Sequence, residues 1–445
     1  MNLRIWFTIS LLSALPVWSQ VNGTTTTSSD KDVNTNIDDA RMSTPPPVSG
    51  EAYPTTLESE KRSNYLNAGL TFNAAYSDNA LGGISGKPVS DVTYSVWPTI
   101  ELDQTTPRWK SVLSYAPGFT FYQHTNGHYE SHNAGIDVQY RVTEHVTATV
   151  HDSFQKTSDV FNQPAVSSGA VYGSAPPPTT VVLPPFANEL SNTANLELTY
   201  QFSASDMVGA SGTFVNLHYP NQAEVPGLYG SSSQGGSAFY NHRLSKRHYL
   251  GAQYQYSRIL AFPTGVQSET QTQTVFLFYT VYLEPTLSVS FSGGPQHYLA
   301  TGALSPSSSW SPAASASLGW QRRRTSFAAS YARIITGGGG LTGTFRSNSA
   351  MASGRWQIAR TWSVGFTGNY AIVNNTLILS NANVGGHTIL GTASLRHPIG
   401  QYFDAEVGYT RIHQSFSDIA VLSTAPDINR EYLAISYRFT RPLGR

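Results

Sequence analysis

The sequence predicts an all-β fold, namely a transmembrane antiparallel up-and-down β-barrel of about 18 strands. Three observations predict it: the composition, the alternation of apolar and polar side chains, and the alternation of short and long connections. The 445 residues include 37 glycines, are 12% aromatic and 12% charged, and carry a formal net charge of zero. Soluble proteins have about 25% charged residues, so this chain has few of the charges that a water-facing surface needs.

The alternation is clearest in residues 91–102, which read DVTYSVWPTIEL. Apolar Val92 and Tyr94 alternate there with Thr93 and Ser95. Successive side chains of a strand point to opposite faces, so this segment has one apolar face and one polar face. Similar stripes lie at 66–76, 109–121, 134–140, 146–150, 194–202, 250–256, 362–366, 403–409 and 433–439, whereas both faces are apolar at 272–283 and the pattern weakens at 237–244.

The connections between these stripes alternate in length. Short connections are expected at 103–108, 142–145, 203–206, 244–247, 284–285, 321–324, 359–361 and 397–400. Long connections are expected between them, at 78–90, 123–130, 158–192, 219–236, 260–269, 299–311, 336–342, 374–386 and 417–428. Strict alternation places all short turns at one end of the strands, which is typical of a transmembrane barrel.

The apolar face is expected to meet lipid, because only a closed sheet satisfies every backbone group inside a membrane. A soluble β-sandwich is the alternative, but its outward positions would be rich in Lys and Glu rather than Ser, Thr, Asn, Gln and Gly. The sequence thus predicts a protein of the cell outer membrane, with both chain ends in the periplasm. Outer-membrane lipids and the outer-membrane assembly machinery are the expected partners.

The first 60 residues have a different character. Residues 1–19 combine Arg4, an apolar stretch and small residues at Val17 and Ser19, which predicts a cleaved signal peptide. An uncleaved membrane anchor is the alternative, but the apolar stretch is short for a spanning helix. Residues 20–60 are rich in Thr, Ser, Asn and Asp and predict a disordered periplasmic linker, so the barrel domain is assigned to residues 61–445.

Two sets of residues are candidates for a role in the barrel. By phase, eight charged side chains should line the lumen: Glu101, Lys110, Asp137, Arg141, Glu197, Asp404, Glu406 and Arg438. Both signs occur, so we favour a structural network of satisfied charges over a substrate-guiding track. Four tryptophans close to short turns, Trp109, Trp320, Trp356 and Trp362, are expected to form an aromatic belt at the membrane interface.

No motif predicts catalysis or a cofactor. The segment LGGISGKP (81–88) lacks the first glycine and the hydroxyl residue of a phosphate loop. His151, Asp152 and Ser153 are adjacent, and adjacent strand residues face opposite ways, so they do not predict a triad. The chain has no cysteine, and His124, His128 and His132 have metal-ligand spacing only on a helix. We expect no enzyme, no metal site, no cofactor and no nucleic-acid partner.

Several stretches carry a family resemblance. SYAPGFTFY (114–122), HDSFQKTSDVF (151–161), SYARIITGGGGLTGTF (330–345) and ISYRFTRPLGR (435–445) resemble outer-membrane β-barrel porins encoded beside exopolysaccharide export genes. The resemblance implies a passive or export-associated pore, with exopolysaccharide export components as partners. The final strand also resembles the outer-membrane assembly signal, although its last aromatic residue, Phe439, lies six residues from the end. The alternative hypothesis is a non-conducting surface adhesin or structural protein that acts through long extracellular loops.

Overall fold

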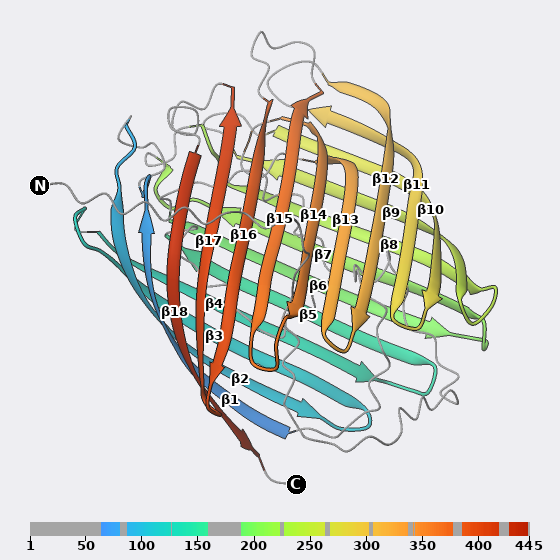
Figure 1. Ribbon diagram of the computed structural model, residues 1–445. Coiled ribbons are helices and arrows are strands. Elements are labelled where there is room, and N and C mark those ends of the chain that lie inside the picture. Colours follow the sequence, from blue (N-terminus) through green and yellow to red (C-terminus); the bar gives the residue numbers. More distant parts are fainter. Residues whose placement is uncertain are drawn as a thin grey trace, which may run out of the picture.

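The computed structural model describes residues 64–443 apart from 81–86, 126, 159–187, 223–226, 263–267, 302–305, 337–340, 342, 377–384 and 418–426. These residues form one closed sheet of 18 strands (Figure 1). The strands are β1 (Asn64–Ser77), β2 (Asp91–Thr105), β3 (Trp109–Tyr122), β4 (His128–Arg141), β5 (Val146–Thr157), β6 (Glu189–Gln201), β7 (Asp206–His218), β8 (Ser231–Arg243), β9 (His248–Ala261), β10 (Ser268–Glu284), β11 (Leu287–Thr301), β12 (Ser307–Arg322), β13 (Thr325–Thr336), β14 (Phe345–Gln357), β15 (Ser363–Asn375), β16 (Gly385–Ile399), β17 (Phe403–Phe416) and β18 (Asp427–Pro442).

Every strand pairs antiparallel with its neighbours in the chain, and β1 pairs with β18 to close the ring. This register runs from Tyr65 opposite Pro442 to Ser77 opposite Arg430. The predicted up-and-down meander of 18 strands is therefore confirmed. The predicted signal peptide and linker lie outside the described residues and stay predictions. The part of the chain described here contains no apolar helix of membrane-spanning length.

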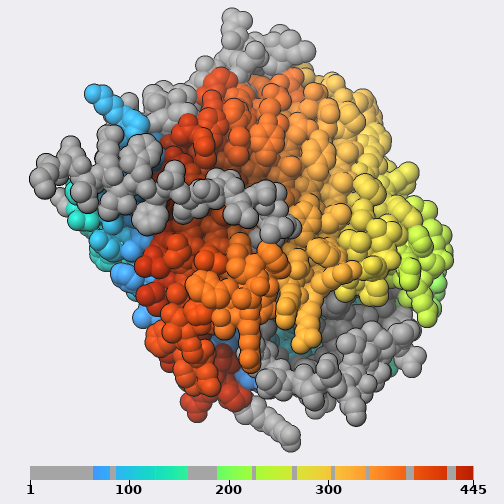
Figure 2. Space-filling view, viewed as in Figure 1, coloured from blue at the N-terminus to red at the C-terminus, as the bar shows by residue number. Residues whose placement is uncertain are grey.

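The outward side chains form an apolar belt. On β15 it runs through Val364, Phe366, Tyr370 and Ile372, and polar Asn374 marks its outer limit. The other strands end their apolar stripe in the same way, at outward-facing polar residues such as His132, Asn192, Asn216, Gln234, Arg258, Gln273, His297, Arg333, Asn348, His387, Arg411 and Glu431. Figure 2 shows the side chains of β12–β18 packed side by side across this outer face. A belt of this length matches the hydrocarbon layer that a barrel wall must cross, about 25 Å.

The inner face combines small hydroxyl residues with aromatic rings laid over glycines. A Cβ at Gly118 would lie 2.3 Å from the ring of Trp97, and one at Gly251 would lie 2.3 Å from the ring of Phe278. These rings therefore need glycine on the neighbouring strand, which is a known way to fix the register of curved sheets. Hydroxyl pairs join other neighbouring strands, for example Thr280 to Ser290 at 2.8 Å between oxygens.

Several predicted connections are shorter in the structure because the strands begin earlier, by the most at two places, and the structure also settles one ambiguity. The long connections predicted at 219–236 and 299–311 are shorter, because β8 already begins at Ser231 and β12 at Ser307. Serine- and glycine-rich starts resemble loops by composition, but the start of β8 pairs with both neighbouring strands and the start of β12 pairs with β11. In 272–283 the outward-facing side chains include Val275 and Leu277, which are 47% and 66% exposed, respectively.

Candidate functional site: the lumen and its outer mouth

The middle of the lumen is lined by polar side chains that water reaches. Ser153, Thr213, Gln255 and Thr367 point inward by the strand register and are all exposed. They come from β5, β7, β9 and β15, which lie on different sides of the ring. The barrel interior at this level is therefore a polar, hydrated surface.

Three of the predicted lumen charges meet on the inner face of β16–β18. Asp404 accepts from Arg396 at 2.8 Å and from Arg438 at 3.1 Å, so one carboxylate holds two guanidinium groups. Glu406 accepts a hydrogen bond from the Tyr432 hydroxyl at 2.8 Å. Sequence reasoning missed Arg396, although the inward phase of β16 would have found it.

Three of the predicted lumen charges on the other wall also have partners. Glu101 accepts from the Asn67 amide at 3.0 Å, and Asp137 bonds to His151 Nδ1 at 2.5 Å. Arg141 donates to the Pro107 carbonyl at 3.3 Å. Lys110 is exposed at the turn end of β3, and Glu197 is half-buried on β6. This geometry supports a network of satisfied charges, and a substrate-guiding role for them stays a hypothesis.

Charge is distributed unevenly around the inner wall. The inner faces of β14, β16 and β18 carry Arg355, Arg396 and Arg438, with Asp404 and Glu406 between them on β17. The inner faces of β2, β4 and β6 carry Glu101, Asp137 and Glu197, with Arg141 at the turn end of β4. Among the described inward-facing residues of β7–β13, only Arg243 is charged, and it lies at the turn end of β8. That sector presents Ser, Thr, Gln and aromatic side chains instead.

The outer mouth is crossed by a buried apolar cluster, here called the mouth cluster. Its members are Leu217, Tyr219, Leu228, Leu341, Phe345, Ala371, Val373 and Phe416. Phe345 and Val373 are 0% exposed. The first three members come from β7 and the connection after it, and the others come from β14, β15, β17 and the connection before β14. In Figure 1 β14–β17 form the near wall and β4–β7 the far wall, so the cluster joins opposite sides of the ring.

The β13–β14 hairpin turns into the barrel at this end. Pairing between β12 and β13 stops at Ala314 opposite Arg333, although both strands continue outward. Beyond that point the Ile335 amide donates to Gln296 Oε1 on β11, at 2.8 Å. At the end of the hairpin Thr344 shares a 2.7 Å hydroxyl bond with Thr270 on β10. These two bonds hold the hairpin inside the mouth.

A half-buried carboxyl group lies next to the mouth cluster. Glu189 begins β6, outside the apolar belt, which ends on that strand at Asn192. Burial raises the pKa of Glu189 to about 7, and the hydrogen bond from the Tyr219 hydroxyl opposes part of this rise. Tyr219 belongs to the mouth cluster, so the protonation of Glu189 is linked to the packing of the mouth.

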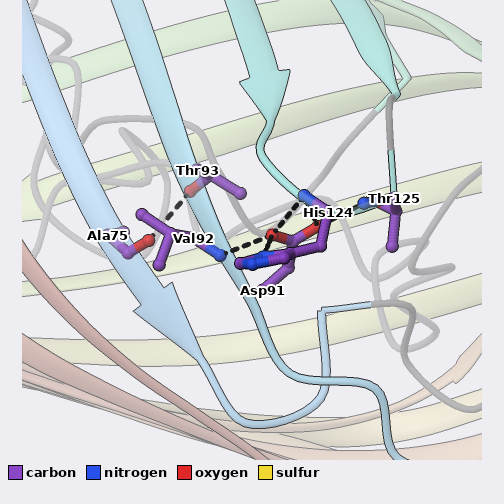
Figure 3. Close-up of polar contacts among 6 residues, drawn as sticks. All are labelled: Ala75, Asp91, Val92, Thr93, His124 and Thr125. Carbon is purple, nitrogen blue, oxygen red and sulfur yellow. Dashed lines mark hydrogen bonds and ion pairs between the residues drawn. The ribbon is translucent and has the colours of Figure 1, made fainter.

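A second carboxylate fixes the connection after β3 (Figure 3). The side chain of Asp91 is fully buried and accepts from the backbone amides of Val92, His124 and Thr125. The Thr125 hydroxyl and the His124 ring also bond to it, at 2.8 and 3.0 Å. Burial alone would raise the pKa of Asp91, but the bonds from Thr125 and His124 outweigh it and lower the pKa to about 2.

The four tryptophans predicted to form an aromatic belt lie together at one end of the barrel. All four tryptophans lie at the turn end; Trp109 and Trp362 are each 40% exposed, and Trp320 and Trp356 are half-buried. Their role as an interfacial belt stays a prediction.

Asp152 accepts a hydrogen bond from Asn192 on the outer face, away from His151. His132 bonds to Tyr115 and His124 to Asp91, and no metal-binding group of three forms among the described residues.

A closed sheet with an outward apolar belt and a polar, hydrated interior defines the class of protein. It is an outer-membrane β-barrel, because such a wall satisfies its backbone in lipid and keeps its polar face in water.

No protein-family model matches the sequence, and the search of curated proteins returned no match. Solved structures with a similar chain trace include the unliganded ferric citrate transporter FecA, at TM-score 0.43 and 8% identity over 85% of this chain and 79% of that one. The FrpB iron transporter from Neisseria meningitidis has TM-score 0.41 and 9% identity over 84% and 81%. Pseudomonas aeruginosa OccK2 in complex with glucuronate has TM-score 0.42 and 11% identity over 84% and 98%. Identities and scores of this size assign no substrate to the chain.

Proposed function

We propose that this protein is a gated passive pore for uncharged polyhydroxylated solutes, with a saccharide as the substrate class. The observation that carries the proposal is the polar inner face of β7–β13, where the described Ser, Thr and Gln side chains bring almost no charge and water reaches positions such as Thr213 and Gln255. Hydroxyl and amide groups such as those of Thr213 and Gln255 exchange hydrogen bonds with sugar hydroxyls. The resemblance to barrels encoded beside exopolysaccharide export genes supports a polysaccharide-related solute.

We assign the gate to the β13–β14 hairpin. In its inward position it contributes Leu341 and Phe345 to the mouth cluster. An outward movement would extend the β12–β13 pairing beyond Ala314 and withdraw these side chains from the mouth. The movement exchanges the bonds to Gln296 and Thr270 for strand pairing, so both positions satisfy the backbone.

A disulfide tests this gate in a chain without natural cysteines. The double variant Thr270→Cys/Thr344→Cys replaces two hydroxyls that are 2.7 Å apart. In planar bilayers the oxidised protein should not conduct, and the reduced protein should conduct more often than wild type. The matched control, Thr280→Cys/Ser290→Cys, joins β10 to β11 within the wall at a similar spacing, 2.8 Å. Its conductance should not respond to oxidation.

The second candidate is a non-conducting surface protein, adhesive or structural, and the packed mouth cluster is the observation that favours it. A reduced Thr270→Cys/Thr344→Cys protein that folds and stays closed would favour this candidate over the pore. Swelling of liposomes in solutions of neutral oligosaccharides then separates the substrate classes. The pore proposal expects faster swelling with neutral than with acidic oligosaccharides of equal size.

A further inference from the structure

Two arginines lie side by side on the outer face of the β13–β14 hairpin. In the β13–β14 register Arg333 is opposite Asn348 and Ile335 is opposite Arg346, so the two arginines are diagonal neighbours on one face. Diagonal neighbours on adjacent strands lie within reach of long side chains. Both stand at the outer limit of the apolar belt, where the next outward residues toward the turn end are Tyr331 and Ala350.

Among the residues that the structure describes, this pair has no counter-charge. Within the described part of the chain, neither arginine forms an ion pair, and the Nε of each is buried without a hydrogen-bond partner. The other outward arginines at this level differ, because Arg258 holds Glu269 at 2.7 Å and Arg411 holds Asp427 at 3.2 Å. A buried donor without an acceptor is costly, so this arrangement favours an acceptor supplied from outside the chain.

The neighbouring amide adds a third donor. Asn348 accepts the Tyr331 hydroxyl through Oδ1 at 3.2 Å, which leaves its amide N–H groups for another partner. Paired guanidinium groups with an amide donor match the oxygens of a phosphate, which accepts bidentate bonds from arginine. The height above the belt is that of the lipid headgroups of the outer leaflet.

We propose that Arg333, Arg346 and Asn348 bind the phosphate of a phosphorylated glycolipid headgroup in the outer leaflet. The headgroup phosphate supplies the acceptors that the two guanidinium groups lack, while the acyl chains lie along the apolar belt below. The site lies on the face of the β13–β14 hairpin that points away from the lumen, and it therefore belongs to the element assigned as the gate.

Native mass spectrometry of the folded, detergent-purified protein with lipid A tests this proposal. Wild type should retain one phosphorylated lipid A, and its dephosphorylated form should bind at least about tenfold more weakly, equivalent to ~1.4 kcal/mol. The variant Arg333→Gln/Arg346→Gln should lose the same preference. The matched control Arg411→Gln, which removes an arginine already paired with a carboxylate, should keep it.

A second double variant tests whether loss of binding reflects misfolding, and competition with inorganic phosphate distinguishes a lipid phosphate from free phosphate. Arg333→Lys/Arg346→Lys keeps both charges and should bind with intermediate strength, because lysine does not form the bidentate bonds. Inorganic phosphate at millimolar concentration should not displace lipid A; full displacement would assign the site to free phosphate and overturn the lipid assignment. Equal retention of both lipid forms by wild type, or unchanged retention by the Gln double variant, would also overturn the proposal.

Discussion

The two ends of the barrel are built by different means. At the turn end the chain closes through short local hairpins, such as Ser203 accepting from Ser205 and bonding to Asp206 within one turn. At the mouth the decisive contacts join residues far apart in the chain, such as Thr270 with Thr344. Local turns therefore fix the register of the wall, whereas long-range contacts at the mouth decide whether the lumen is open.

The largest effect on the opening of the mouth is expected from a substitution at Phe345, which is 0% exposed in the mouth cluster. Phe345→Ser should increase the open time of single channels, because loss of a buried phenyl ring removes roughly 3 kcal/mol of packing from the closed mouth. The control is Phe278→Ser, a ring that is 1% exposed but lies in the wall over Gly251. It should lower the refolding stability without opening the mouth; equal opening by both variants would count against a localised gate.

The next effect concerns the charges toward the turn end of the lumen. Asp404→Asn leaves Arg396 and Arg438 without their shared carboxylate. Breaking such a mostly buried network costs about 3 kcal/mol, and the local charge becomes more positive. Denaturant refolding should show the loss, and reversal potentials in a salt gradient should shift toward anion preference. Asp427→Asn, on the outer face, serves as the control and should leave the reversal potential unchanged.

A smaller, pH-dependent effect is expected at Glu189. The folded protein binds this proton more tightly than the unfolded chain, because burial raises the pKa from 4.5 to about 7. The stabilisation by the protonated form is therefore complete below about pH 4.5 and is lost as pH rises through about 7. Channel opening should increase between pH 6 and pH 8. Glu189→Gln, which stays neutral, should abolish the pH dependence; a pH response that persists in this variant would assign it to another group.

The smallest effect is expected at Asp91, whose role is confined to one connection. Asp91→Ala removes the acceptor for the amides of His124 and Thr125 and should speed hydrogen exchange there without changing the conductance. Because the pKa of Asp91 is lowered to about 2, its stabilising contribution is present above pH 3.8 and falls as pH drops through about 2. Faster exchange spread over the whole barrel would show that Asp91 supports more than this connection.

Much of the wall was predictable because period-two alternation is a local property. The inward phase of Glu101, Asp404 and Arg438 follows directly from counting along the strands. Their partners were less accessible to sequence reasoning. Glu406 and Arg438 lie on neighbouring strands, but the stagger between β17 and β18 brings Asp404 to Arg438 and leaves Glu406 to Tyr432.

The amino-acid sequence by itself determined the approximate strand number, the direction of the faces outside 272–283, and the ends at which short turns and long connections lie. It did so because lipid on one face of the wall and water on the other require apolar and polar residues to alternate along each strand. Only the tertiary structure decided that an apolar cluster crosses the mouth and that two arginines stand without a counter-charge among the described residues. Contacts such as that between Gln296 and Ile335 depend on how strands from different parts of the chain curve toward one another, and no local pattern records that curvature.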